Sequence, residues 1–189
     1  MEKNFFTNSM NLAKEICKVK INKGDVVVDA TMGNGNDTIF LAQLVGEQGK
    51  VYSFDIQKIA LENTRKRLKE SNMEGHVQLI LDGHENLYKY INEKVTLVMF
   101  NLGYLPNACR SITTKGETTI LAIKKALELL KENGVIILVI YYGHEEGKAE
   151  RKMLYEFTSC LNQKEYNVVN LRFTNQINNP PELICIEKR

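Results

Sequence analysis

The sequence lacks a hydrophobic run long enough to cross a membrane. No stretch approaches roughly 18 consecutive apolar residues, and the start M-E-K-N-F-F is not a basic segment followed by an apolar core. No linker rich in proline, serine or glycine divides the 189 residues either. We therefore expect a cytoplasmic protein with no membrane partner, folded as a single domain over residues 1–189.

Paired cysteines and a dominant charge are also lacking. The four cysteines form no C-x-x-C pair, which argues against a zinc site or a disulfide framework, so we expect no metal. The formal net charge is only +2, whereas dedicated nucleic-acid binders are usually strongly basic. Basic clusters at 14–23, 65–69 and 148–152 are compatible with RNA binding, but ordinary solvated helix faces look the same.

The most informative segment that is present predicts a cofactor site. A short β-branched run ends at Asp29 and is followed by the turn A-T-M-G-N-G-N-D at 30–37. A strand, a glycine turn and a helix in this order leave backbone N–H groups free to face a ligand. Asp55 closes the next apolar run about 20 residues later, the distance at which a carboxylate can bind both hydroxyls of a ribose. The segment therefore predicts an adenosine cofactor.

Two details favour S-adenosylmethionine over a nicotinamide dinucleotide. A dinucleotide fingerprint would place a third glycine three residues after Gly35, where this chain has Thr38. Asp29 would repel a pyrophosphate, whereas it could orient an ammonium group directly or through water. The predicted cofactor residues are Asp29, Met32, Gly33, Asn34, Gly35, Asn36, Asp37, Asp55, Gln57, Asp82, Gly83 and His84.

Short apolar runs alternate with helical patterns, which implies a mainly parallel sheet covered by helices on both faces. Strands are expected at 25–29, 50–54, 77–81, 95–100 and 134–140. Two further runs, at 166–173 and 183–187, have no helix between them and should form an antiparallel hairpin. The predicted fold class is α/β, Rossmann-like, with seven strands, and loop 174–182 is expected on the catalytic edge.

Five motifs occur in the order found in one known family. They are D-A-T-M-G-N-G-N-D at 29–37, F-D-I-Q at 54–57, F-N-L-G-Y-L-P at 100–106, Y-Y-G-H-x-x-G at 141–147 and N-Q-x-N-N-P-P at 175–181. From about residue 10 to the C-terminus, the chain resembles small bacterial class I methyltransferases labelled as rRNA methylases. The resemblance implies methylation of the aminomethyl group on the wobble uridine of tRNA. One departure is N-A-C-R at 107–110, where the family usually has glycines, an acid and a lysine.

The candidate catalytic residues follow the fourth and fifth strands. Asn101 and Tyr104 lie at the positions where amino-methylating enzymes carry an N-P-P-Y type motif. Asn101 would accept a hydrogen bond from the amine, and Tyr104 would stack on a base. His144 could take the proton of the amine. A polar strand end, a core tyrosine and a structural histidine remain open as alternatives. The predicted substrate-binding residues are Tyr142, Arg110, Gln176 and Asn178.

Three other functions remain open from the sequence alone. A methyltransferase for rRNA or a small molecule would share the cofactor residues and differ in the loops 101–116 and 174–182. A nicotinamide-dependent oxidoreductase would use the same type of fold, and a non-catalytic module would keep the pocket without turnover. We expect tRNA as partner, with rRNA as the alternative, and a homodimer is one way to extend the surface for a large RNA.

Overall fold

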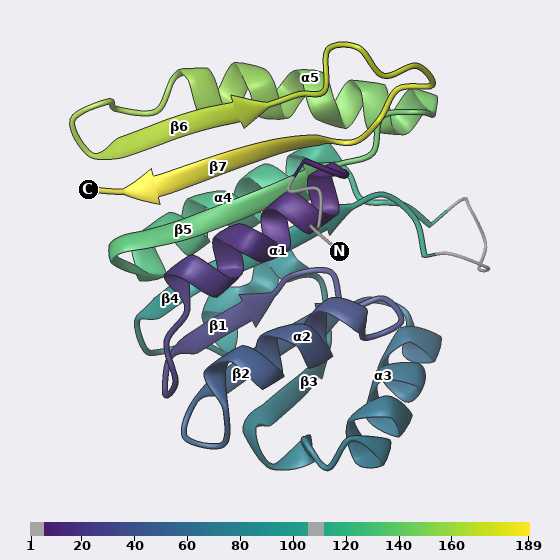
Figure 1. The fold of residues 1–189 in the computed structure, drawn as a ribbon, viewed down its shortest axis with the longest axis vertical. Helices are drawn as coiled ribbons and strands as arrows, with labels where there is room; N and C mark the ends of the chain where they lie inside the picture. Colours follow the sequence, from purple (N-terminus) through teal and green to yellow (C-terminus); the bar gives the residue numbers. More distant parts are fainter. Residues whose placement is uncertain (1–5, 106–111) are drawn as a thin grey trace.

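The computed structural model describes residues 6–105 and 112–189. Within them, seven strands form one sheet in the order β3-β2-β1-β4-β5-β7-β6 (Figure 1). The strands are β1 (Val26–Asp29), β2 (Lys50–Asp55), β3 (Val77–Leu81), β4 (Val95–Leu102), β5 (Leu130–Ile140), β6 (Tyr166–Leu171) and β7 (Glu182–Lys188). The first five strands run parallel, and β7 lies antiparallel between β5 and β6. The predicted fold class is confirmed.

Helices cover both faces of this sheet (Figure 1). They are α1 (Ser9–Lys20), α2 (Asn36–Val45), α3 (Lys58–Glu70), α4 (Gly116–Leu129) and α5 (Glu145–Ser159), with short 3-10 segments η1 (Glu74–His76) and η2 (His84–Lys89). Successive strand residues face opposite sides of a sheet. Accordingly, Val27 packs in one core with α1 and α2, and Val28 packs in the other with η2, α4 and α5.

The carboxyl ends of β1 to β5 meet at one edge of the sheet, and the last hairpin reaches the same edge. Glu182 at the start of β7 pairs with Ile140 at the end of β5, and Leu171 at the end of β6 pairs with Leu183. The connection between β6 and β7 therefore lies beside the carboxyl ends, as the sequence predicted. The strand β5 begins four residues earlier than expected, at Leu130, and passes through Asn133 with a φ of 60°.

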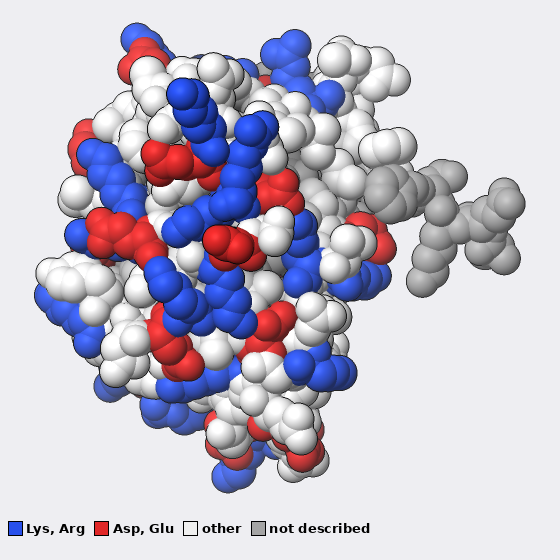
Figure 2. Space-filling model, turned by 90° about the vertical axis from the view of Figure 1, so that its left-hand side faces the viewer, with Lys and Arg blue, Asp and Glu red and all other residues white. Residues whose placement is uncertain are grey.

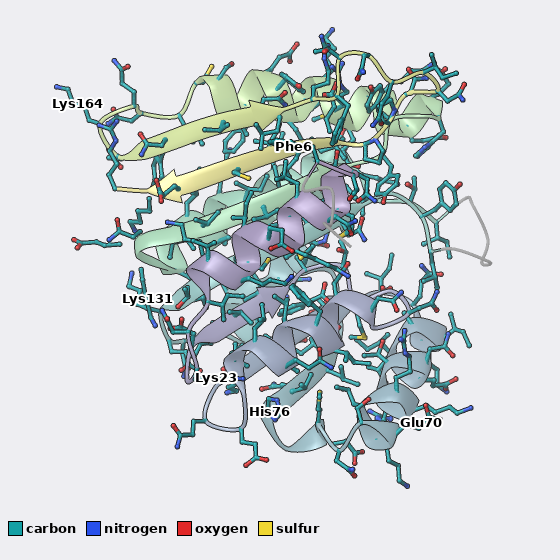
Figure 3. All side chains as sticks on the ribbon, viewed as in Figure 1. Phe6, Lys23, Glu70, His76, Lys131 and Lys164 are labelled. Carbon is teal, nitrogen blue, oxygen red and sulfur yellow. The ribbon has the colours of Figure 1, made fainter. Side chains whose placement is uncertain are left out.

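The opposite edge of the sheet carries charges of both signs. Lysines and arginines alternate there with acids (Figure 2), and Lys23 and Lys131 lie at this edge (Figure 3). Lys131 Nζ lies 3.1 Å from Asp25 Oδ1, and Lys20 pairs with Glu187. Such pairing leaves this face without the uniform basic character that a polyanion would need.

Among the described residues, no helix is long and apolar enough to span a membrane.

Candidate active site

A cleft of about 1220 Å³ opens at the carboxyl edge of the sheet. It is lined by the ends of β1 to β5 and by residues 178–181 of the hairpin loop. In the sheet, β1 lies between β2 and β4, and open α/β sheets bind ligands where the strand order reverses in this way. The volume of the cleft is slightly above the roughly 300–1,000 Å³ that is usual for a pocket that binds one small molecule.

The turn after β1, residues 30–35, forms the floor of the cleft and is called the cofactor loop below. Its shape is fixed by α3, because Arg67 donates to the backbone oxygen of Asn34 at 2.8 Å and to Asn36 Oδ1 at 2.6 Å. Gly35 has a φ of 77°, and a Cβ there would lie 2.7 Å from Thr64 Oγ1. Gly35 therefore lets the loop pack on α3, although it does not itself line the cleft.

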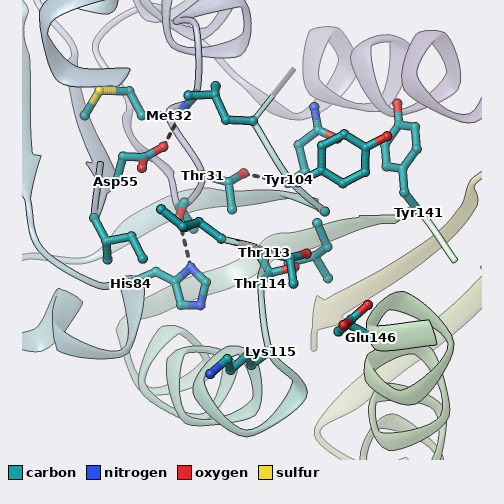
Figure 4. Close-up of a pocket in the computed structure, with 18 of the residues that line it drawn as sticks. Thr31, Met32, Asp55, His84, Tyr104, Thr113, Thr114, Lys115, Tyr141 and Glu146 are labelled. Atoms are coloured by element: carbon teal, nitrogen blue, oxygen red, sulfur yellow. Dashed lines mark hydrogen bonds between the residues drawn. The ribbon is translucent and has the colours of Figure 1, made fainter. Parts of the chain in front are cut away.

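Asp55 at the end of β2 joins the cofactor loop to the second strand (Figure 4). The backbone N–H of Gly33 donates to its Oδ2 at 2.9 Å, and the N–H of Gln57 donates to its Oδ1 at 2.9 Å. Burial raises the pKa of Asp55 above its ordinary value. Asp55 lines the cleft, and a carboxylate has acceptor capacity beyond these two bonds, so that it can also accept hydroxyl groups of a ligand.

Asp29 does not line the cleft, and its predicted role in orienting an ammonium group, directly or through water, stays a prediction. Its side chain is buried beneath the cofactor loop. Oδ1 accepts from the backbone N–H of Thr31 at 3.1 Å, and Oδ2 accepts from Thr38 Oγ1 at 2.6 Å. Burial, reinforced by the charge of Asp37, raises the pKa of Asp29 to about 7. Asp29 supports the loop from below.

Asp82 and His84 line the cleft at the end of β3, as predicted. Asp82 Oδ1 accepts from Asn86 Nδ2 at 2.9 Å, and Oδ2 accepts from Tyr90 at 2.9 Å. His84 Nδ1 lies 3.0 Å from the backbone oxygen of Ala30, which can only accept, so Nδ1 carries the proton. Burial lowers the pKa of His84. Its Nε2 is therefore a buried acceptor, without a partner among the described residues.

The predicted catalytic residues come together on the other side of the cleft. The ring centroids of Tyr104 and His144 lie 5.6 Å apart in an edge-to-face arrangement. Tyr104 also pairs with Thr113 in an antiparallel bridge, and Thr113 Oγ1 lies 3.5 Å from His144 Nε2. Asn101 lies between this group and the cofactor loop; its backbone N–H donates to Thr31 Oγ1 at 2.7 Å.

Tyr142 lines the cleft in a position fixed from behind by α5. The guanidinium of Arg151 lies 4.8 Å from the ring centroid of Tyr142 and 4.8 Å from that of Tyr155. Arg151 also donates two hydrogen bonds, at 2.8 and 3.0 Å, to the buried carboxylate of Glu182. The stacked cation and the ion pair hold Tyr142 in place against β7.

Most of the predicted site residues line this cleft. Those that do are Met32, Gly33, Asn34, Asn36, Asp37, Asp55, Gln57, Asp82, Gly83, His84, Asn101, Tyr104, Tyr142, His144 and Asn178. Gln176 is exposed and lies outside the cleft lining, so its role in substrate binding stays a prediction. Arg110 lies outside the described residues.

The sequence did not identify several residues that line the cleft near Asn101 and Tyr104. Glu146 and the segment 113–115 face the cleft there (Figure 4). Tyr141, which begins the Y-Y-G-H motif, lines the cleft as well. The threonines of the segment follow no recognisable pattern. In the described part of the chain, no group of three or more His, Cys, Asp or Glu side chains could hold a metal ion.

The strand order, the reversed final hairpin and the cleft at the switch point define a Rossmann-like methyltransferase fold. Residues 51–187, more than half of the chain, match the family model described as "Putative rRNA methylase", and the chain belongs to that family. A second model, for protein-L-isoaspartate(D-aspartate) O-methyltransferase, matches residues 6–90.

Individual relatives agree with this assignment. The chain is 42% identical over 151 residues to the chloroplastic tRNA (mnm(5)s(2)U34)-methyltransferase of Arabidopsis thaliana, covering 75% of this chain and 55% of that protein. It thus spans about half the length of that curated relative. A crystal structure of a putative rRNA-methylase from Clostridium thermocellum matches with a TM-score of 0.96 and 50% identity, over 97% of this chain and 99% of that one. A putative methyltransferase from Streptococcus mutans, solved in complex with SAH, matches with a TM-score of 0.89 and 42% identity over 100% of both chains.

Proposed function

We propose that this protein transfers a methyl group from S-adenosylmethionine to the amine of a 5-aminomethyl group on the wobble uridine of tRNA. Membership of the family and the 42% identity to a protein named for this position of tRNA support the proposal. The rRNA alternative rests on the family description and on the names of solved relatives such as the Clostridium thermocellum protein.

The observation that carries the donor half of the proposal is the bonding of Asp55. Its two oxygens each accept one backbone N–H and have further acceptor capacity, which suits the two hydroxyls of a ribose. His84 Nε2 adds a buried acceptor that a ligand N–H or O–H would satisfy. These groups fit an adenosine, and the Streptococcus mutans relative was solved with SAH.

On the acceptor side, the residues of the chain position an amine and a base. Asn101 can accept a hydrogen bond from the amine through its side-chain oxygen and so direct the nitrogen lone pair. Tyr104, 39% exposed beside His144, is the aromatic residue on which we expect a base to stack. His144 is placed to receive the proton that the amine loses.

Positioning supplies most of the catalysis in this scheme. When bound, S-adenosylmethionine supplies an electrophilic methyl carbon. The amine nitrogen would form a bond to this carbon while the bond between the carbon and sulfur breaks, which leaves S-adenosylhomocysteine. Asn101 and Tyr104 need only hold the amine in line, and well-oriented reactants gain about 7 to 11 kcal/mol in this way.

The proposal is tested by giving the protein methyl-labelled S-adenosylmethionine with separate pools of tRNA, rRNA and small metabolites. We expect label only in tRNA. A tRNA carrying 5-aminomethyluridine should gain one methyl group at the wobble nucleoside by mass spectrometry, and the same tRNA with plain uridine should gain none. Label confined to rRNA or to the metabolites would refute the proposal.

A further inference from the structure

Asp37 lies between the cofactor loop and the acceptor side of the cleft. It belongs to the first turn of α2, and the residue is 7% exposed. Its Oδ2 accepts a hydrogen bond from Asn101 Nδ2 at 3.1 Å, and its Oδ1 lies 3.4 Å from Lys14 Nζ on α1. Asp37 thus connects two helices to the end of β4.

This contact determines which way the Asn101 amide faces. An ionised carboxylate only accepts hydrogen bonds, so the NH₂ group of the amide must point at Asp37. The amide is planar, so its carbonyl oxygen occupies the other branch and points away from Asp37; Asn101 itself lines the cleft. A flipped amide would set its oxygen against the carboxylate and lose the bond. The main chain of Asn101 is held as well, by Thr31.

We propose that Asp37 is a positioning residue for methyl transfer, which keeps the carbonyl oxygen of Asn101 directed at the amine that receives the methyl group. This role rests on the proposed function, and the expectation that Asp37 contacts the cofactor stays a separate prediction. Lys14 neutralises the carboxylate from the opposite side, so Asp37 acts through hydrogen-bond geometry. The methyl-accepting substrate that this arrangement selects must carry an N–H or O–H group that donates a hydrogen bond to the carbonyl oxygen of Asn101.

Purified Asp37→Ala and Asp37→Asn variants test the proposal against wild type on tRNA bearing 5-aminomethyluridine. We expect Asp37→Ala to lower kcat by about 10- to 100-fold, because a small misplacement of a reacting group is enough for such a loss. The KM for S-adenosylmethionine should stay unchanged. Asp37→Asn keeps an oxygen for Asn101 and should retain most of the wild-type kcat. If Asp37→Ala does not fold, Asp37→Ser, too short to reach the amide, replaces it.

A spectroscopic measurement follows the same contact without any reaction. The side-chain amide signals of Asn101 are identified in a ¹H–¹⁵N spectrum by their loss in Asn101→Ala. In Asp37→Ala, and not in Asp37→Asn, we expect these signals to shift and their hydrogens to exchange faster.

Three outcomes would overturn the inference: wild-type kcat in Asp37→Ala, a rate in Asp37→Asn as low as in Asp37→Ala, or Asn101 signals that do not move. These failures are distinct from failure of the proposed function. If the proposed function fails, the wild type itself does not methylate tRNA, and the spectra still report whether Asp37 orients Asn101.

Discussion

The backbone N–H of Gly33 donates a 2.9 Å hydrogen bond to Asp55 Oδ2, joining the cofactor loop to the end of β2. Asp55 therefore serves two purposes in the proposed site. It fixes the position of the loop, and it lines the cleft with acceptor capacity left for a ligand. A carboxylate at this position is required for both.

Replacing Asp55 by alanine should weaken binding of S-adenosylhomocysteine by roughly 10- to 100-fold, because hydrogen bonds to a charged group contribute about 1.5–3 kcal/mol. Isothermal titration calorimetry measures the change. The control is Asp25→Asn, which alters a carboxylate at the opposite edge of the sheet, outside the cleft. Equal affinity for Asp55→Ala and wild type would remove Asp55 from the donor site.

Gly35→Ala should destabilise the protein more than Gly24→Ala does. Both glycines have a positive φ, 77° and 88°, so alanine is strained at either position by about 1–3 kcal/mol. A Cβ at Gly35 would also lie 2.7 Å from Thr64 Oγ1, whereas a Cβ at Gly24 would meet nothing within 4 Å. Urea denaturation of both variants isolates the cost of this contact. Equal losses would mean that Thr64 moves aside freely.

Asp29 makes the stability of the protein depend on pH. Its pKa is about 7 in the folded protein because of burial, against about 3.9 in an unfolded chain. The folded state therefore binds the proton more tightly, and the resulting stability is complete below about pH 4 and is lost as the pH rises to about 7. The asparagine in Asp29→Asn cannot ionise, so between about pH 4 and pH 7 the free energy of unfolding of this variant should fall less than that of the wild type. The difference between the two slopes should be up to about 1.4 kcal/mol per pH unit.

The same denaturation series contains its own control. Although burial opposes it, hydrogen bonds from Asn22, Thr96 and Lys131 lower the pKa of Asp25. Stability from Asp25 is therefore present above its unfolded pKa and is lost as the pH falls, which is the opposite sign. Asp29→Asn and Asp25→Asn should change the pH profile in opposite directions. A wild-type profile for Asp29→Asn would show that Asp29 stays ionised when folded.

Tyr104→Leu should weaken the binding of tRNA and leave the affinity for S-adenosylmethionine unchanged. Stacking of a base on an aromatic ring contributes about 1–3 kcal/mol, so we expect roughly a 10- to 100-fold higher Kd for tRNA. Tyr88 is 52% exposed, does not line the cleft, and provides the matched control Tyr88→Leu. Fluorescence anisotropy with labelled tRNA reports the affinity. If both leucine variants bind tRNA equally well, Tyr104 does not contact the base.

The layout of the sheet could be predicted because its signals are local. Apolar runs bounded by turns located every strand to within a few residues. The helical pattern after the second strand is equally local: Ala60, Leu61, Thr64 and Leu68 are spaced to share one face of α3, and all four are buried. The lack of a helix between the last two runs identified the hairpin. The beginning of β5 was missed because Glu132 and Asn133 are polar, although they continue the strand as an exposed irregularity.

The orientation of individual side chains could not be predicted in the same way. Asp29 and Asp37 both flank the glycine turn, and the sequence treats them alike as cofactor ligands. In the fold, Asp29 points under the loop to Thr38, while Asp37 points across the sheet to Asn101, 64 positions away in sequence. That difference depends on the packing of α2 against β1 and β2.

The attachment of the cofactor loop to α3 through Arg67 also has a thermodynamic consequence. Bonds within the protein already determine the conformation of residues 30–35, so an incoming donor has little chain to order and incurs little entropic penalty there. Association should therefore be rapid and essentially lock-and-key at this loop. If the hydrogen bonds of Arg67 to the loop were lost, part of the recognition would become induced fit. The donor would then associate more slowly but bind with the same final geometry.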